Sequence, residues 1–246
     1  MNAKPYRNLA ALLLLLSAAP ARATAIVVRR ERGELVIGAD SATGRWVGGR
    51  RIALPPHACK IRQFGGVYFA ATGLVYDPAV GLDVMASAES AALQGGGVSG
   101  VAARFAARVS DPLRASAISV DGPRGRERML PTVTAIFAAV EGGLPVFALA
   151  VLRIDGFTPE GRGRLRAGTF APPAPAPALL FLGTSEAAAA YEGEHPEVWA
   201  AGSVAGVREL LEVQVGATPA TVGPPVDILR LTKDGGEWVQ RKEGCR

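Results

Sequence analysis

Thr24 is the residue whose chemistry depends most on where this chain is cut. It follows the run Ala21-Arg22-Ala23, which places small residues at the two positions that a signal peptidase reads. A cut after Ala23 would give Thr24 a free α-amine, and the ordinary pKa of such an amine is about 7.7 to 8.0, so part of it is uncharged near neutral pH. Thr24 would then hold nucleophile and general base in one residue. Taken alone, Thr24 is better explained as the first residue of a strand.

Asp40 and Lys60 are the charged residues that could activate Thr24. Asp40 lies sixteen residues after Thr24, and Lys60 stands in the run Cys-Lys-Ile-Arg. A cation beside Thr24 would lower the pKa values of its hydroxyl and amine, and a carboxylate would hold that cation in place. Singly, Asp40 is better explained as a turn residue and Lys60 as a solvated charge. The spacing of the three together favours a catalytic site.

The segments that contain these residues carry a resemblance to a known family. Residues 24–30 read Thr-Ala-Ile-Val-Val-Arg-Arg, residues 36–41 read Val-Ile-Gly-Ala-Asp-Ser, and an isoleucine follows Lys60. Together they resemble the proteasome β-subunit and HslV branch of the N-terminal nucleophile (Ntn) hydrolases. The resemblance implies an α+β fold, a four-layer αββα sandwich of two antiparallel sheets flanked by helices. It also implies that Thr24 is the nucleophile, that Asp40 pairs with Lys60, that the substrate is a peptide or another amide, and that the chain forms a homo-oligomer.

Later segments extend the resemblance over most of residues 24–240. Gly73 lies in a turn similar to the one whose glycine N–H stabilises the family's oxyanion, and Thr184 stands where a family serine supports the threonine amine. Residues 223–235 resemble the family's closing strand and Lys-Asp-Gly turn. Lys60 comes four residues later than in the bacterial peptidase, so residues 46–56 would carry an insertion. Without the family, Gly73 is equally well explained by an ordinary turn and Thr184 by helix capping.

The chain departs from the family before residue 223. Pro219 and Val222 stand where proteasome β-subunits carry an Asp and a Ser that complete the hydrogen bonds of the amine. Activation of the amine would then need other groups, such as Thr218, Thr221 or backbone carbonyls. The departure therefore keeps a second hypothesis open, a catalytically silent binding or scaffold subunit.

The cysteines and histidines are too few to predict another chemistry. Cys59 and Cys245 could form a disulfide in an oxidising compartment or remain free thiols, because sequence separation says nothing about distance. The only histidines are His57 and His195, so the four ligands of a closed zinc site are not available in a paired spacing. A serine hydrolase would need one of these histidines as base, and no Gly-x-Ser-x-Gly motif is present. We expect no metal and no cofactor.

Residues 1–23 have the features of a secretory signal peptide. They hold three basic residues, no acidic one and the apolar run 9–19, which as a helix would rise only about 16 Å, half the hydrocarbon core. Without them the formal charge falls from +5 to +2, so a nucleic-acid partner is not supported. We expect one domain, residues 24–246, in the periplasm or outside the cell. There we expect no membrane anchor and no ATP-driven unfoldase.

The elements that must position these residues follow the order strands, two helices, strands, two helices, strands. Strand runs joined by glycine turns, without a βαβ rhythm, predict antiparallel sheets with helices on their outer faces. Asp77 and Pro78 predict a helix start, and the Gly- and Pro-rich segment 156–177 predicts a long loop. The expected strands are 25–29, 34–39, 61–64, 67–71, 132–140, 144–154, 179–182, 225–231 and 237–240, and the expected helices are 77–93, 99–114, 185–191 and 204–215.

Overall fold

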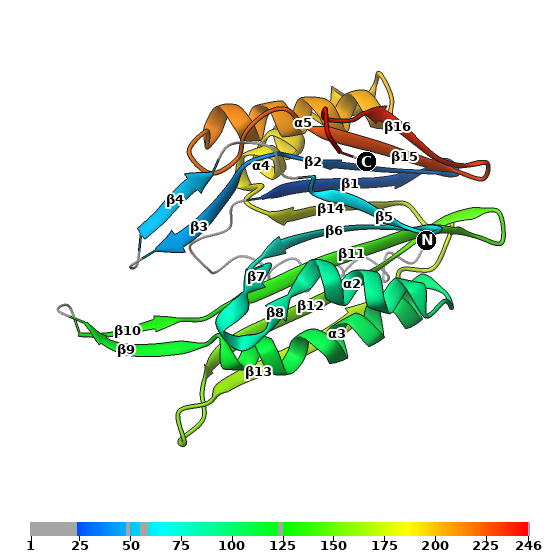
Figure 1. The fold of residues 1–246 in the computed structure, drawn as a ribbon. Coiled ribbons are helices and arrows are strands. Elements are labelled where there is room, and N and C mark those ends of the chain that lie inside the picture. The colour runs from blue at the N-terminus through cyan, green and yellow to red at the C-terminus, as the bar shows by residue number, and fades with distance from the viewer. Residues whose placement is uncertain (1–23, 48–49, 55–58, 123–124, 246) are drawn as a thin grey trace, which may run out of the picture.

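Two five-stranded antiparallel sheets stack face to face between two layers of helices (Figure 1). The computed structural model describes residues 24–47, 50–54, 59–122 and 125–245. Helices α4 (Glu186–Glu194) and α5 (Ser203–Ala217) cover one sheet, and α2 (Val84–Leu93) and α3 (Val98–Ala115) cover the other. The predicted four-layer αββα sandwich is confirmed. Among the described residues, no helix has both the length and the apolar character needed to cross a membrane.

The first sheet has the strand order β14-β1-β2-β15-β16. Its register brings the ends of four strands together at one end of the sheet. Ala25 lies opposite Gly183, Ile26 opposite Ala39, and Ala39 opposite Asp227. Residues that flank these strand ends, Thr24 and Asp40 among them, must therefore lie close together at this end of the sheet. The strands are β1 (Ala25–Glu31), β2 (Glu34–Ala39), β14 (Ala178–Gly183), β15 (Asp227–Thr232) and β16 (Gly235–Gln240).

The second sheet has the order β13-β12-β11-β6-β5. Its β5 begins directly after Lys60, and Ile61 lies opposite Ala70 near the end of β6, so the start of β5 and Gly73 share one end of the sheet. The strands are β5 (Ile61–Phe64), β6 (Val67–Gly73), β11 (Thr132–Glu141), β12 (Leu144–Phe157) and β13 (Gly163–Phe170).

Alternating apolar side chains of both sheets form the core between them. Ile26, Ile37 and Leu229 from the first sheet pack in one cluster with Ile136 and Phe147 from the second. Each of these side chains is at most 1% exposed, so their burial supplies much of the hydrophobic stabilisation that holds the sheets together. This packing fixes Lys60, which precedes the second sheet, against Thr24 at the edge of the first.

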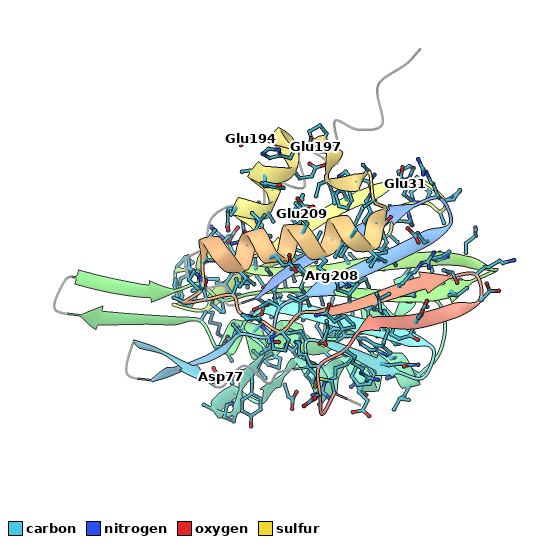
Figure 2. The ribbon with its side chains drawn as sticks, turned by 90° about the horizontal axis from the view of Figure 1, so that it is seen from above. Glu31, Asp77, Glu194, Glu197, Arg208 and Glu209 are labelled. Carbon is cyan, nitrogen blue, oxygen red and sulfur yellow. A yellow bond between two sulfur atoms is a disulfide. The ribbon has the colours of Figure 1, made fainter. Side chains whose placement is uncertain are left out.

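The outer helices are tied to one another as well as to the sheets. Figure 2, seen from above, shows α5 with Arg208 and Glu209 running across the first sheet, and the segment with Glu194 and Glu197 beside it. The hydroxyl of Tyr191 in α4 donates to Glu209 of α5 at 2.8 Å. The two helices therefore cover the sheet as one layer.

The predicted helix start at Asp77 is wrong. Asp77 and Pro78 instead open a single 3-10 turn, η1 (Pro78–Val80), which ends at Gly81 in the left-handed conformation (φ 71°). The helix α2 starts only at Val84, where the carboxylate of Asp83 accepts from the amide of Ala86 at 2.9 Å. An Asp-Pro pair serves a 3-10 turn as well as an α-helix, so the pattern alone could not choose between them.

The segment 156–177 is not one long loop. Its first two residues end β12, and its middle is β13, which pairs with β12 at the edge of the second sheet. Only the residues between these strands and after β13 are irregular. Arg164 and Arg166 of β13 both form ion pairs with Asp155. Because this edge strand is buried at Gly163 alone, it lacks the apolar alternation by which strands are predicted.

Three short hairpins and one 3-10 turn complete the described fold without having been predicted. The first overlaps the expected insertion at 46–56, and the second lies near residue 120. The three are β3 (Thr43–Val47) with β4 (Arg50–Leu54), β9 (Ile118–Gly122) with β10 (Gly125–Met129), and β7 (Tyr76–Asp77) with β8 (Leu82–Asp83); the turn η2 (Pro196–Trp199) follows α4.

Candidate active site

Thr24, Asp40 and Lys60 lie together at one end of the stacked sheets, beside the start of β1, the end of β2 and the start of β5. The ammonium of Lys60 donates a hydrogen bond to the hydroxyl of Thr24, and its Nζ lies 3.6 Å from Oδ1 of Asp40. Thr24 is 7% exposed, Lys60 is 6% exposed and Asp40 is fully buried. The structure thus brings together the three residues that the spacing singled out.

The carboxylate of Asp40 accepts three backbone hydrogen bonds. Its Oδ1 accepts from the amide of Ala25 at 3.0 Å, and its Oδ2 accepts from Ala42 at 2.8 Å and Gly223 at 3.1 Å. Burial raises the pKa of Asp40 above its ordinary value, and the ammonium of Lys60 and the three amides act in the opposite direction. Asp40 therefore joins the start of β1, the end of β2 and the approach to β15.

The arrangement favours ionisation of the Thr24 hydroxyl. A cation within hydrogen-bond distance stabilises the alkoxide, and burial strengthens that attraction because little water screens it. The carboxylate of Asp40 orients the ammonium and balances its charge. Chemically, the site can activate a threonine hydroxyl as a nucleophile.

The turn after β14 holds the backbone of Thr24. The amide of Thr184 donates to the Thr24 carbonyl at 2.8 Å, so Thr184 supports Thr24 through its backbone. The N-terminal cap of α4 is Ser185, one residue later, and its side chain makes no capping bond. Thr184 therefore does not cap the helix.

Gly183 is a site residue that the sequence did not single out. It has a φ of +77°, and a Cβ built on it would lie 1.9 Å from the Thr24 carbonyl oxygen and 2.6 Å from Oγ1 of Thr72. Only glycine lets β14 approach Thr24 this closely. The hydroxyl of Thr72 is buried there, without a hydrogen-bond partner in the described part of the chain.

We expect Gly183→Ala to destabilise the protein by about 3 kcal/mol or more, because overpacking adds to the left-handed strain. Urea unfolding followed by circular dichroism measures this. Gly66→Ala is the control, since its Cβ would meet nothing within 4 Å and its φ is ordinary. Equal effects of the two substitutions would contradict the close approach of Gly183 to Thr24.

Gly73 lies at the end of β6 and is glycine for a packing reason. Its φ is +102°, and a Cβ there would lie 2.0 Å from the carbonyl oxygen of Thr132. That carbonyl accepts from the amide of Leu74 at 2.8 Å. Through the adjacent Thr72, which reaches the Gly183 turn, Gly73 lies in the surroundings of Thr24.

The loop before β15 supports the site by its backbone. Pro219 is exposed and Val222 is fully buried in the apolar cluster under α5, so neither brings a polar side chain to Thr24. The hydroxyl of Thr221 donates to the Thr218 carbonyl at 3.2 Å, and that of Thr218 bonds to Gln214. These hydroxyls are thus used within the loop and at the end of α5, and the loop reaches the site through the amide of Gly223, which donates to Asp40.

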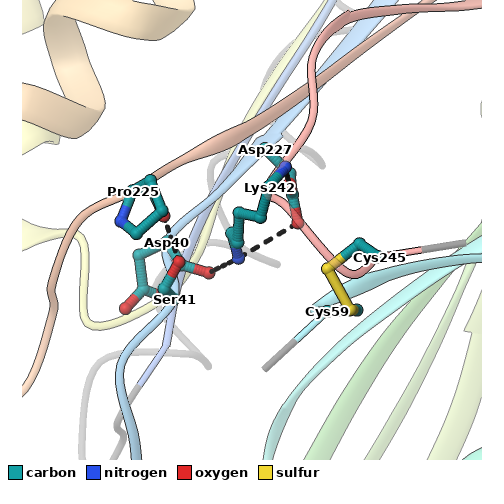
Figure 3. The surroundings of a disulfide bond; sticks show 7 residues. All are labelled: Asp40, Ser41, Cys59, Pro225, Asp227, Lys242 and Cys245. Atoms are coloured by element: carbon teal, nitrogen blue, oxygen red, sulfur yellow. Dashed lines mark hydrogen bonds and ion pairs between the residues drawn. A yellow bond between two sulfur atoms is a disulfide. The ribbon is translucent and has the colours of Figure 1, made fainter. Parts of the chain in front are cut away.

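A disulfide joins Cys59 to Cys245 beside the site, a pairing that the sequence left open (Figure 3). Three residues before Cys245, the buried Lys242 forms an ion pair with the buried Asp227 at 3.0 Å. Burial lowers the pKa of Lys242, and the charge of Asp227 opposes this. No pattern in the sequence distinguishes Lys242 from a surface lysine, so sequence reasoning missed it.

One of the two histidines lies among the described residues. His195 stacks on Tyr191 and faces Glu197 at 2.9 Å, in the segment between α4 and η2, and His57 lies outside the described residues. Among the described residues, no group of three or more His, Cys, Asp or Glu side chains could hold a metal ion.

Comparison with known proteins supports the fold. None of the protein-family models matches this chain, and none of the curated proteins does.

Among solved structures, eukaryotic HslV from Trypanosoma brucei matches with a TM-score of 0.52 at 17% identity, over 85% of this chain and 99% of that chain. An Anbu (Gly-1) mutant from Hyphomicrobium sp. strain MC1 matches with a TM-score of 0.48 at 15% identity, over 89% of this chain and 85% of that one. Thiobacillus denitrificans BPH in complex with epoxomicin gives 0.43 at 16% identity, over 85% and 98%. With its two stacked sheets and its helix layers, the chain has the fold of the proteasome β-subunit and HslV group of Ntn hydrolases.

Proposed function

We propose that this protein is a threonine-type amidohydrolase or peptidase whose nucleophile is Thr24, exposed as an N-terminus by removal of residues 1–23. The observation that carries the proposal is the hydrogen bond from the buried ammonium of Lys60 to the Thr24 hydroxyl, with Asp40 behind the ammonium. A buried cation costs free energy, so its place on a hydroxyl indicates that it activates that hydroxyl.

The reaction proceeds through an acyl-enzyme. Thr24 Oγ attacks the amide carbonyl, and its proton passes to the α-amine, directly or through a water, and then to the leaving amine. Lys60 stabilises the developing alkoxide, and the Gly73 amide holds the oxyanion of the tetrahedral intermediate. Water then hydrolyses the ester on Thr24. Thr184 keeps the Thr24 backbone in place through its amide.

The same proposal places the protein in an oxidising compartment, the periplasm or the extracellular space. Residues 1–23, which lie outside the described residues, are the signal peptide, and its removal creates the α-amine. The disulfide between Cys59 and Cys245 is compatible with such a compartment. We also propose that the chain forms a homo-oligomer, as the resemblance to ring-forming proteins implies.

The test uses the secreted, processed protein. N-terminal sequencing establishes whether it begins at Thr24, and intact mass after treatment with a β-lactone establishes whether it is acylated. We expect one adduct, absent in Thr24→Ala and retained in Thr169→Ala, a control at an exposed threonine of β13. A mature N-terminus at another residue, or an adduct that still forms in Thr24→Ala, would contradict the proposal.

A catalytically silent binding subunit is the second candidate. It is favoured by the loop before β15, where Pro219 is exposed and Val222 is buried, so that neither supplies an amine-supporting side chain. This candidate predicts a folded protein that neither forms the adduct nor cleaves broad peptide and amide libraries. Thr24-dependent cleavage of any such substrate would refute it.

The pH dependence of acylation offers a further prediction. The full acylation rate needs an ionised Asp40 and an uncharged Thr24 amine. A plot of the logarithm of the rate against pH should therefore rise with a slope of two at low pH and with a slope of one above a break at the pKa of Asp40. Because burial raises the pKa of Asp40, the break lies above about pH 3.9, the ordinary value. The β-lactone rate constant measured against pH checks this. In Asp40→Asn the residual rate should lack the steeper limb. In the unsubstituted protein, a break at or below pH 3.9 would contradict the assignment.

A further inference from the structure

The segment 241–245, which follows β16, reaches the site at two points. At the first, Nζ of Lys242 donates to the carbonyl oxygen of Asp40 at 3.0 Å (Figure 3). At the second, Cys245 forms the disulfide with Cys59, the residue directly before Lys60. One short segment thus contacts the backbone of Asp40 and is bonded beside Lys60.

Lys242 is itself held rigidly. Its Nζ lies 3.0 Å from Oδ2 of Asp227, and its own amide donates to Oδ1 of the same carboxylate at 2.9 Å. Asp227 is fully buried as the first residue of β15, opposite Ala39, which precedes Asp40. The contact with Asp40 therefore comes from a side chain anchored to the neighbouring strand.

The four buried charges alternate in sign along this path. Lys60, Asp40, Lys242 and Asp227 have side chains that are 8%, 0%, 3% and 0% exposed. Two apolar side chains in place of Lys242 and Asp227 would avoid the cost of removing two charges from water. An ion pair kept at such a place needs a reason beyond stability, and its hydrogen bond to Asp40 supplies one.

We infer that Lys242 is a positioning residue of the active site, which with Asp227 and the Cys59–Cys245 disulfide fixes the backbone of Asp40 and the place of Lys60. The inference rests on the proposed function. Lys242 Nζ is hydrogen-bonded to the main chain of Asp40, and so it sets where the carboxylate stands and how the carboxylate directs Lys60 toward Thr24. Side chains that orient metal ligands by hydrogen bonds commonly change activity about ten- to a hundredfold when removed, and we take the same range for Lys242.

The decisive variant removes both charges, Asp227→Asn with Lys242→Met. It leaves no unpaired buried charge, and the asparagine can still accept from the amide of residue 242. We therefore expect the variant to fold while the contact with Asp40 is lost. Lys242→Met alone is the companion variant, and Lys233→Met, at an exposed lysine of the β15–β16 turn, is the matched control. A second route to the same question is Cys59→Ser with Cys245→Ser.

Two readouts separate this inference from the proposed function. The first is the rate constant for β-lactone acylation of Thr24. The second is amide hydrogen exchange, followed by NMR, at the three N–H groups that bond to Asp40, those of Ala25, Ala42 and Gly223. We expect the paired variant to be acylated about ten- to a hundredfold more slowly, with faster exchange at these amides, and Lys233→Met to match the unsubstituted protein.

Acylation at the unsubstituted rate, with unchanged exchange, would overturn the inference and leave Lys242 as a partner that only neutralises Asp227. If the unsubstituted protein is not acylated at all, the proposed function fails, while the exchange at the Asp40 amides still decides the positioning role. If the paired variant does not fold, the Cys59→Ser/Cys245→Ser variant decides it, and unchanged exchange there counts against the inference.

Discussion

Replacing Lys60 by methionine should slow acylation of Thr24 by a β-lactone about 10²- to 10³-fold, the loss typical when one donor to a developing oxyanion is removed. Methionine keeps the length and the apolar stem of the side chain but takes away the ammonium that donates to the Thr24 hydroxyl. The hydroxyl then loses the cation that stabilises its ionised form. Intact mass against time at fixed inhibitor concentration gives the rate constant.

The matched control for this substitution is Lys233→Met, which removes the same charge from an exposed turn and should leave the rate unchanged. Lys60→Arg should not restore activity, because a planar guanidinium cannot take the place of a compact ammonium at a site that is only 6% exposed. An unaltered rate in Lys60→Met would show that the Lys60 ammonium does not activate Thr24, even if Thr24 is the acylated residue.

The cluster of Thr24, Asp40 and Lys60 was predictable because two independent signals pointed to it. Thr24 follows a cleavage pattern, and Asp40 directly follows the apolar run of β2, whose pairing with β1 brings Asp40 beside Thr24. Lys60 precedes β5 of the other sheet, and the stacking of the two sheets places it against Thr24. The hairpin of β1 and β2 alone places Asp40 beside the start of β1, where its carboxylate accepts from the amide of Ala25. Local pattern and tertiary position agree for these three residues.

The parts that were missed are those where tertiary contacts decide. β13 is an edge strand with little apolar alternation, so only its pairing with β12 defines it as a strand. Gly183 looks like any turn glycine until the Thr24 carbonyl is found against it. The pairing of Cys59 with Cys245 depends on where two distant segments meet, and sequence separation gives no such information.

Asp40→Asn should destabilise the protein by about 3 to 5 kcal/mol, the cost typical of breaking a buried ion pair. Either orientation of the asparagine amide loses a bond. An NH₂ in the place of Oδ2 faces the amides of Ala42 and Gly223, and one in the place of Oδ1 faces the amide of Ala25 and the ammonium of Lys60. Whichever is chosen, a buried donor loses its acceptor and Lys60 loses its counter-charge.

Urea unfolding followed by circular dichroism measures this loss as a lower midpoint with an unchanged slope. Asp234→Asn, at an exposed position of the β15–β16 turn, is the control and should change the free energy of unfolding by less than about 0.5 kcal/mol. Since a typical domain is stable by only about 5 to 15 kcal/mol, the Asp40 substitution removes a large share of the total. A loss below about 1 kcal/mol would mean that Asp40 does not join the three strand ends that its carboxylate touches, and the positioning of Lys60 would then need another cause.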